Sequence, residues 1–76
     1  MITAALAVLK TDEQRNIISD FYQMYKNRFY AIAYEHLHNL QDSEEAIQEA
    51  FLRIAVNPYK FFSLSGDERI YLVSAI

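Results

Sequence analysis

Apolar and aromatic residues recur at helical spacing through most of the first half of the chain. They lie three or four positions apart, as on one face of a helix: Ile18, Phe21, Tyr22, Tyr25, Phe29, Ile32, Ala33, Leu37 and Leu40. Residues 11–14 (Thr-Asp-Glu-Gln) have the composition of an N-cap with its reciprocal glutamine, and neither proline nor glycine interrupts residues 11–40. The pattern predicts one helix over residues 11–40, roughly 40 Å long at ~1.5 Å per residue.

A second helix is predicted to begin at Asp42, because residues 42–45 (Asp-Ser-Glu-Glu) form another capping box. Its expected core stripe consists of Ala46, Ile47, Ala50, Phe51, Ile54 and Ala55. The helix should stop at Asn57, since the residue before a proline is pushed out of the α region.

The remaining segments predict a loop, a third helix and a short N-terminal helix. Residues 59–65 are expected to form an apolar loop, and residues 65–68 (Ser-Gly-Asp-Glu) a capping signature. The helix that follows has apolar residues at Ile70, Leu72, Val73 and Ile76. A short helix over residues 4–10 is expected to precede the long one. The sequence thus predicts an all-α fold, a small three-helix bundle with one long first helix, in a single domain over residues 1–76.

The chain stops at Ile76 in mid-pattern, without a helix stop signal, which favours a helix truncated there. We therefore expect the apolar residues near this end to be partly uncovered: Phe61, Phe62, Ile70, Val73 and Ile76. An exposed apolar patch usually finds a partner, so a two-fold homodimer that buries residues 59–76 is predicted.

Composition narrows the class of protein. With 76 residues, 53% of them hydrophobic and only one glycine and one proline, the chain is a folded, helix-rich domain and not a disordered linker. It has no cysteine, which excludes disulfides and thiolate metal sites and fits a reducing compartment. The apolar N-terminus lacks the positive region of a signal peptide, and no run reaches the ~20 residues that span a bilayer. A cytoplasmic location without membrane contact is expected.

The net charge of −3 lies entirely within residues 41–57, where four carboxylates face one arginine. These residues are Asp42, Glu44, Glu45, Glu49 and Arg53. A domain that grips nucleic acid through phosphates should be basic, so this acidic stripe suits a basic protein surface better.

No constellation predicts catalysis, a cofactor or a metal. His36 and His38 are two positions apart and point to different faces of a helix, so they are interpreted as surface histidines. No glycine-rich phosphate loop, nucleophile elbow or zinc signature occurs. The aromatic residues favour core packing over base stacking. Tyr59, Phe61 and Phe62 are equally compatible with capping the bundle and with binding a partner.

Glu45, Gln48, Glu49 and Leu52 follow one another at i, i+3, i+4 and i+7, so they share one face of the second helix. Two interpretations stay open from the residues alone. In the first, Glu49 pairs with Arg53 and Glu45 supports the cap of the helix. In the second, the four residues form a contact patch for a basic helix. The like charges of Glu45 and Glu49, one turn apart, repel slightly, so helix stability does not explain the arrangement.

Residues 42–54 (Asp-Ser-Glu-Glu-Ala-Ile-Gln-Glu-Ala-Phe-Leu-Arg-Ile) closely resemble the second conserved region of sigma factors of the extracytoplasmic-function group. The apolar pattern of residues 21–37 is similar to the first helix of that region, and residues 69–73 (Arg-Ile-Tyr-Leu-Val) look like the start of its third. The likeness covers about residues 12–76.

The resemblance implies a transcription initiation factor, without enzymatic activity, that docks on the β′ coiled coil of the RNA polymerase core. Carried over, Glu45, Gln48, Glu49 and Leu52 would contact β′. The family's asparagine, base-capturing loop and arginine-rich helix have no counterpart after Ile76, so promoter DNA is expected as a partner of the intact protein only. An anti-sigma protein is a further candidate partner. The rival hypothesis is a helical interaction or dimerisation module unrelated to transcription.

Overall fold

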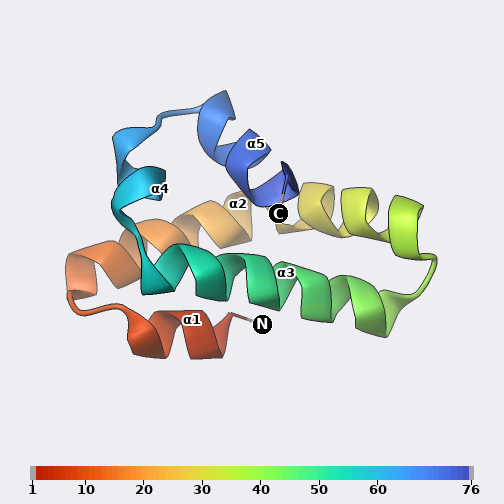
Figure 1. Cartoon of the computed structure of the whole chain (residues 1–76), viewed down its shortest axis with the longest axis horizontal. Coiled ribbons are helices and arrows are strands. Elements are labelled where there is room, and N and C mark those ends of the chain that lie inside the picture. The colour runs from red at the N-terminus through yellow and green to blue at the C-terminus, as the bar shows by residue number, and fades with distance from the viewer. Residues whose placement is uncertain (1, 76) are drawn as a thin grey trace.

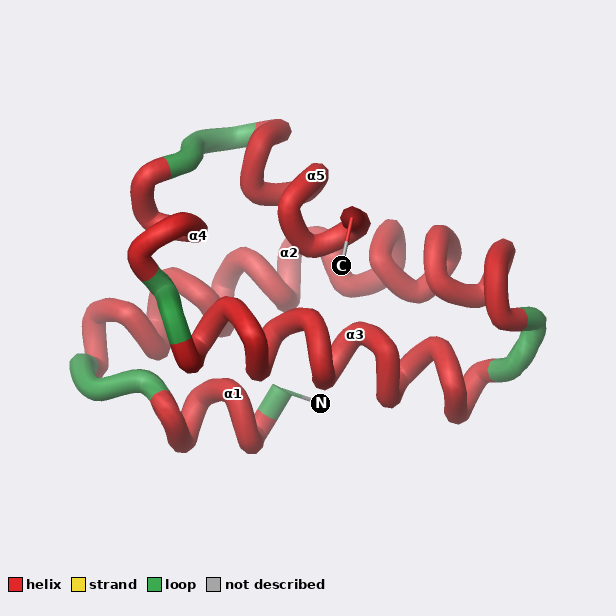
Figure 2. The backbone as a smooth tube through the Cα atoms, in the orientation of Figure 1, coloured by secondary structure: helices red, strands yellow, loops and turns green. Residues whose placement is uncertain are grey.

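The structure is a computed structural model that describes residues 2–75. This part of the chain consists of helices joined by short connections (Figure 2). In chain order the helices are α1 (Thr3–Val8), α2 (Asp12–Leu37), α3 (Leu40–Val56), α4 (Tyr59–Ser63) and α5 (Asp67–Ala75) (Figure 1). None of the described residues lies in a strand, which confirms the predicted all-α class. None of these helices combines the length and apolar character needed to cross a bilayer.

Helices α2 and α3 form an antiparallel hairpin that organises the other elements. Helix α2 begins as predicted, because the Thr11 side chain accepts a hydrogen bond from the Gln14 amide at 3.1 Å. It ends at Leu37, three residues earlier than predicted. His38 adopts a left-handed conformation (φ 53°) and donates its amide to the Tyr34 carbonyl at 2.8 Å, which closes the helix.

The N-cap of α3 is Asn39, so the predicted start at Asp42 is wrong. The Asn39 side chain accepts a hydrogen bond from the Asp42 amide at 3.0 Å, and Leu40 is already helical. Ser43 is completely buried within the helix and donates its hydroxyl to the Asn39 carbonyl at 2.7 Å. The end of α3 agrees with the prediction, since Asn57 is its C-cap.

Aromatic rings from α2, α3 and α4 meet at the centre of the core. Phe51 of α3 has no exposed surface, and its ring lies 5.4 Å from that of Tyr22 and 5.8 Å from that of Phe29. Phe21 lies 5.1 Å from Phe61 in an edge-to-face arrangement. The core prediction is confirmed for most residues of the two predicted stripes: Ile18, Phe21, Tyr22, Phe29, Ile47, Ala50, Phe51, Ile54 and Ala55.

Three residues of the predicted core stripes are exposed. Leu37 and Leu40 flank the α2–α3 turn, which extends beyond the other helices, and Leu40 is 71% exposed (Figure 1). Ala46 is exposed at the edge of α3. The apolar pattern therefore continues beyond the part of the hairpin that other helices cover.

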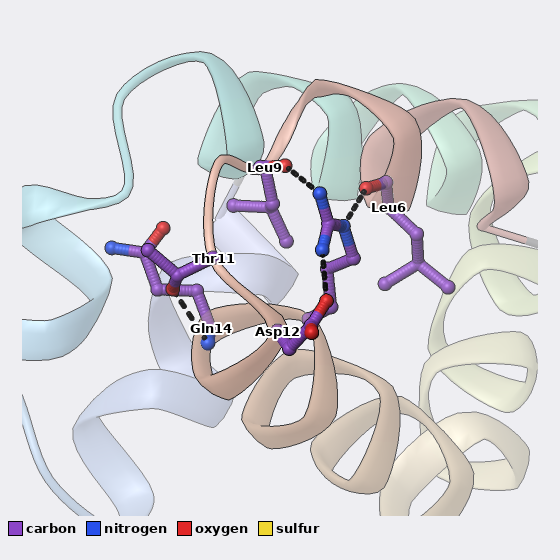
Figure 3. Close-up of polar contacts among 6 residues, drawn as sticks. Leu6, Leu9, Thr11, Asp12 and Gln14 are labelled. Carbon is purple, nitrogen blue, oxygen red and sulfur yellow. Dashed lines mark hydrogen bonds and ion pairs between the residues drawn. The ribbon is translucent and has the colours of Figure 1, made fainter.

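Helix α1, predicted as a short N-terminal helix, lies against α3, and Ile2, Ala5 and Leu9 in and beside it are buried. Arg15 of α2 fixes its C-terminal end. The Arg15 guanidinium donates to the Leu6 carbonyl at 3.2 Å, to the Leu9 carbonyl at 2.9 Å, and to the Asp12 carboxylate (Figure 3). One cation thus satisfies carbonyls that a helix end leaves without partners.

The predicted loop over residues 59–65 is wrong, because residues 59–63 form α4. Arg69 of α5 closes this helix, donating from Nε to the Phe61 carbonyl at 3.1 Å and to the Leu64 carbonyl at 2.9 Å. Its guanidinium carbon also lies 4.6 Å from the centre of the Phe61 ring. Helix α5 starts at Asp67, within the predicted capping signature over residues 65–68.

The expected exposure of the C-terminal apolar residues is wrong for three of them. Phe61, Ile70 and Val73 are buried by the chain's own helices, and Phe62 is half-buried against Phe61. Ile76 lies outside the described residues. The exposed aromatic residues of this region are Tyr59 and Tyr71.

Candidate docking face on α3

Glu45, Gln48, Glu49 and Leu52 lie on the side of α3 that points away from the core. The first three side chains are exposed and Leu52 is half-buried. On the opposite side of the helix are the buried residues Ile47, Ala50, Phe51 and Ile54. The four residues named first, here called the acidic face, thus form a continuous surface on a helix whose other side is held by the core.

Glu49 forms an ion pair with Arg53, one helical turn further along. The Arg53 Nη2 atom lies 2.9 Å from the Glu49 Oε1 atom, and the two side chains remain 63% and 62% exposed. An exposed pair at this spacing stabilises a helix by about 0.3–0.5 kcal/mol. The predicted pair between Glu49 and Arg53 is therefore observed. The predicted cap role of Glu45 is not, because Asn39 supplies the cap of α3.

Val56 extends the acidic face at its C-terminal end. It follows Leu52 by four residues, and it is 68% exposed. It is absent from the face predicted from the sequence, which ends at i+7 with Leu52. Continuing the same series from Glu45 to i+11 leads to Val56. The face thus has carboxylates at its N-terminal end and two aliphatic side chains at its C-terminal end.

Glu44 does not belong to this face, although it adjoins Glu45 in sequence. Its half-buried side chain lies on the flank of α3 near Tyr30 of α2. Burial, a hydrogen bond with Tyr22 and the charge of Glu44 together raise the pKa of Tyr30 to about 12, and burial is the largest of these causes. Tyr30 therefore stays protonated at neutral pH beside this carboxylate.

A shallow groove of 290 Å³ runs beside the acidic face, between α2 and α3 and next to α5. Apolar side chains of all three helices line it, among them Ile32, Ala46 and Val73. Glu49 and Arg53 also line it, so their ion pair lies where the groove meets the acidic face.

The sigma-70 region 2 family model matches residues 21–75. This chain belongs to the sigma-70 region 2 family. The matched segment contains the whole of α3, and α1 lies before it. Comparison with curated proteins and with solved structures gives no match.

Sigma region 2 is a non-enzymatic part of a transcription initiation factor and binds the RNA polymerase core. Within the described residues, no three His, Cys, Asp or Glu side chains are grouped so that they could hold a metal ion. Both His36 and His38 are exposed, and the His38 ring lies 6.2 Å from that of Tyr34. For this sigma region 2 chain, the surface that calls for explanation is the acidic face.

Proposed function

We propose that this sigma region 2 chain docks on the coiled coil of the polymerase β′ subunit through the acidic face. The observation that carries the proposal is that Glu45, Gln48 and Glu49 are exposed together on the side of α3 opposite its buried stripe. The extracytoplasmic-function group is the branch of the family that residues 42–54 resemble.

Charge supports a basic partner. Residues 41–57 contain the whole negative excess of the chain, and Glu45 and Glu49 repel each other within the helix. This repulsion between the two carboxylates is relieved when cations of a partner lie between them, so it favours binding of a basic surface. The half-buried Leu52 and the exposed Val56 add apolar area at the C-terminal end of the face, and an interface buries apolar as well as polar area.

Rigidity supports the same proposal. The core side of α3 is packed against the aromatic rings of α2, and α1 covers a further flank. Docking on a helix held in this way loses little conformational entropy beyond that of the exposed side chains. Neither a cofactor nor a covalent step enters the proposal.

Residues 1–76 are proposed to act as one domain, in the cytoplasm, where the polymerase works. Promoter DNA is proposed as a partner of the intact sigma factor and not of this face, whose negative charge would repel phosphates. An anti-sigma protein stays a candidate partner. The homodimer stays a prediction without its original basis, because Phe61, Ile70 and Val73 are buried. The family match argues against a module unrelated to transcription.

Binding to a purified β′ coiled-coil fragment tests the proposal. The affinity should fall as salt rises, because charge pairs at a surface are screened over about 8–10 Å. The double change Gln48→Ala plus Glu49→Lys should abolish binding and alter the unfolding free energy by only about 0.5 kcal/mol, as is usual for surface sites.

Glu35→Lys is the matched control, since Glu35 is exposed on α2 and the charge reversal is the same. This variant should bind nearly as tightly as the unmodified protein. The proposal would be refuted if the unmodified protein fails to bind at low salt, or if the control loses as much affinity as the double variant.

A further inference from the structure

The Glu49–Arg53 ion pair places a cation of the protein's own at the edge of the acidic face. Arg53 Nη2 and Glu49 Oε1 are 2.9 Å apart, and both side chains are more than half exposed. A cation of an approaching partner therefore meets a carboxylate that already has a partner. Glu45 lies eight residues before Arg53, about 12 Å along the helix axis. That separation exceeds the Debye length of ~8 Å at physiological salt, so Arg53 affects Glu45 much less.

We propose that Arg53 is a specificity-determining residue that weakens docking of the basic partner by competing for Glu49. The inference rests on the docking function proposed above and names the residue that regulates its strength. Arg53 does not compete for Glu45, and the Oε1 atom of Glu49 becomes available to a partner cation only when Arg53 moves aside. A partner with one cation near Glu45 would bind moderately, and one that also displaces Arg53 would bind tightly.

The surroundings of Arg53 allow this exchange without unfolding. Its side chain lines the 290 Å³ groove between α2 and α3, so there is open space on the side away from the acidic face. Releasing Glu49 breaks only a solvent-exposed ion pair, which is a weak interaction. The helix itself does not have to change, because the core side of α3 is unaffected.

The test uses the full chain and the purified β′ coiled-coil fragment, with dissociation constants measured at low and high salt. Arg53→Gln should bind about two- to fourfold more tightly at low salt, from the loss of one weak competing pair and of one repelling charge. Arg53→Lys, which keeps the charge and can still pair, should bind like the unmodified protein. Arg28→Gln removes one positive charge from an exposed site on α2 and should change the affinity by less than about 1.5-fold, because the charge is screened.

A double-mutant cycle isolates the pair. In a Glu49→Gln background, Arg53→Gln should raise the affinity less than it does in the unmodified protein, because only the repelling charge is removed and there is no carboxylate left to release. At high salt the difference between Arg53→Gln and the unmodified protein should vanish.

The outcomes separate the inference from the docking function. If the unmodified protein binds and Arg53→Gln binds more weakly, Arg53 contacts the partner directly and the inference is wrong while docking stands. If Arg53→Gln equals Arg28→Gln, only net charge matters and the inference is again wrong. If the unmodified protein does not bind at all, both proposals are overturned.

Discussion

Replacing Arg15 by methionine would remove the cation that joins α1 to α2 while keeping a side chain of similar length. The change deletes hydrogen bonds to the Leu6 carbonyl at 3.2 Å and the Leu9 carbonyl at 2.9 Å, together with the contact to Asp12. A hydrogen bond from a charged donor contributes about 1.5–3 kcal/mol when it is shielded from water. The Arg15 side chain is 38% exposed, and water can replace it at the carbonyls. We therefore expect a total loss of about 1–2 kcal/mol.

A domain of this length has an unfolding free energy of about 4–11 kcal/mol, so the variant should remain folded. The loss should be concentrated in α1, which Arg15 holds at its C-terminal end. Hydrogen exchange of the α1 amides should accelerate about 5- to 30-fold, the factor that corresponds to 1–2 kcal/mol. Hydrogen exchange of the amides in the middle of α3 should accelerate by no more than the same factor.

Arg28→Met is the control, because Arg28 is also an arginine of α2 but is exposed. Urea denaturation of both variants gives the total change in unfolding free energy. If Arg15→Met leaves exchange in α1 unchanged, or costs no more than the Arg28 control, the guanidinium does not hold α1.

Two further predictions concern the core and the response to alkaline pH. Phe51→Ala should cost about 3–5 kcal/mol in urea denaturation, because the ring is fully buried between Tyr22 and Phe29, and a loss below about 1 kcal/mol would contradict the described packing. The raised pKa of Tyr30, about 12 against an ordinary 10.0, means that the folded state holds this proton more tightly. Its contribution to stability is present below pH ~10 and should be lost as the pH rises from about 10 to 12. The unfolding free energy of Tyr30→Phe, measured by urea denaturation at a series of fixed pH values, should therefore fall less steeply over this range than that of the unmodified protein. Identical pH profiles would contradict the assignment.

Most of the hairpin could be predicted because its signals are local. The Thr11 cap and the stop at Asn57 follow from residues within one turn of each helix end. The outward position of Glu45, Gln48 and Glu49 follows from their spacing relative to Phe51, since the angle between successive residues of a helix is constant. The docking role of these residues stays a prediction, since it depends on a partner.

The errors arise where local signals compete or where distant contacts decide. Asn39 and Asp42 are both good N-caps, and the choice depends on the left-handed turn at His38, which ends the preceding helix. Helix α4 has only five residues and would be unstable alone. It is stabilised by Phe61 against Phe21 and by the Arg69 contacts, and neither can be read from residues 59–65.

The packing of α1 on α3 has a consequence for the order in which the chain is assembled. During synthesis α1 emerges before α3, so the surface that covers Ile2, Ala5 and Leu9 is completed only when α3 follows, which at ~5–20 residues per second takes roughly 2–9 s. The α2–α3 hairpin, whose partners are neighbours in sequence, can form as soon as α3 is available. Helix α1 is thus expected to pack in its native position only after α3 has been made.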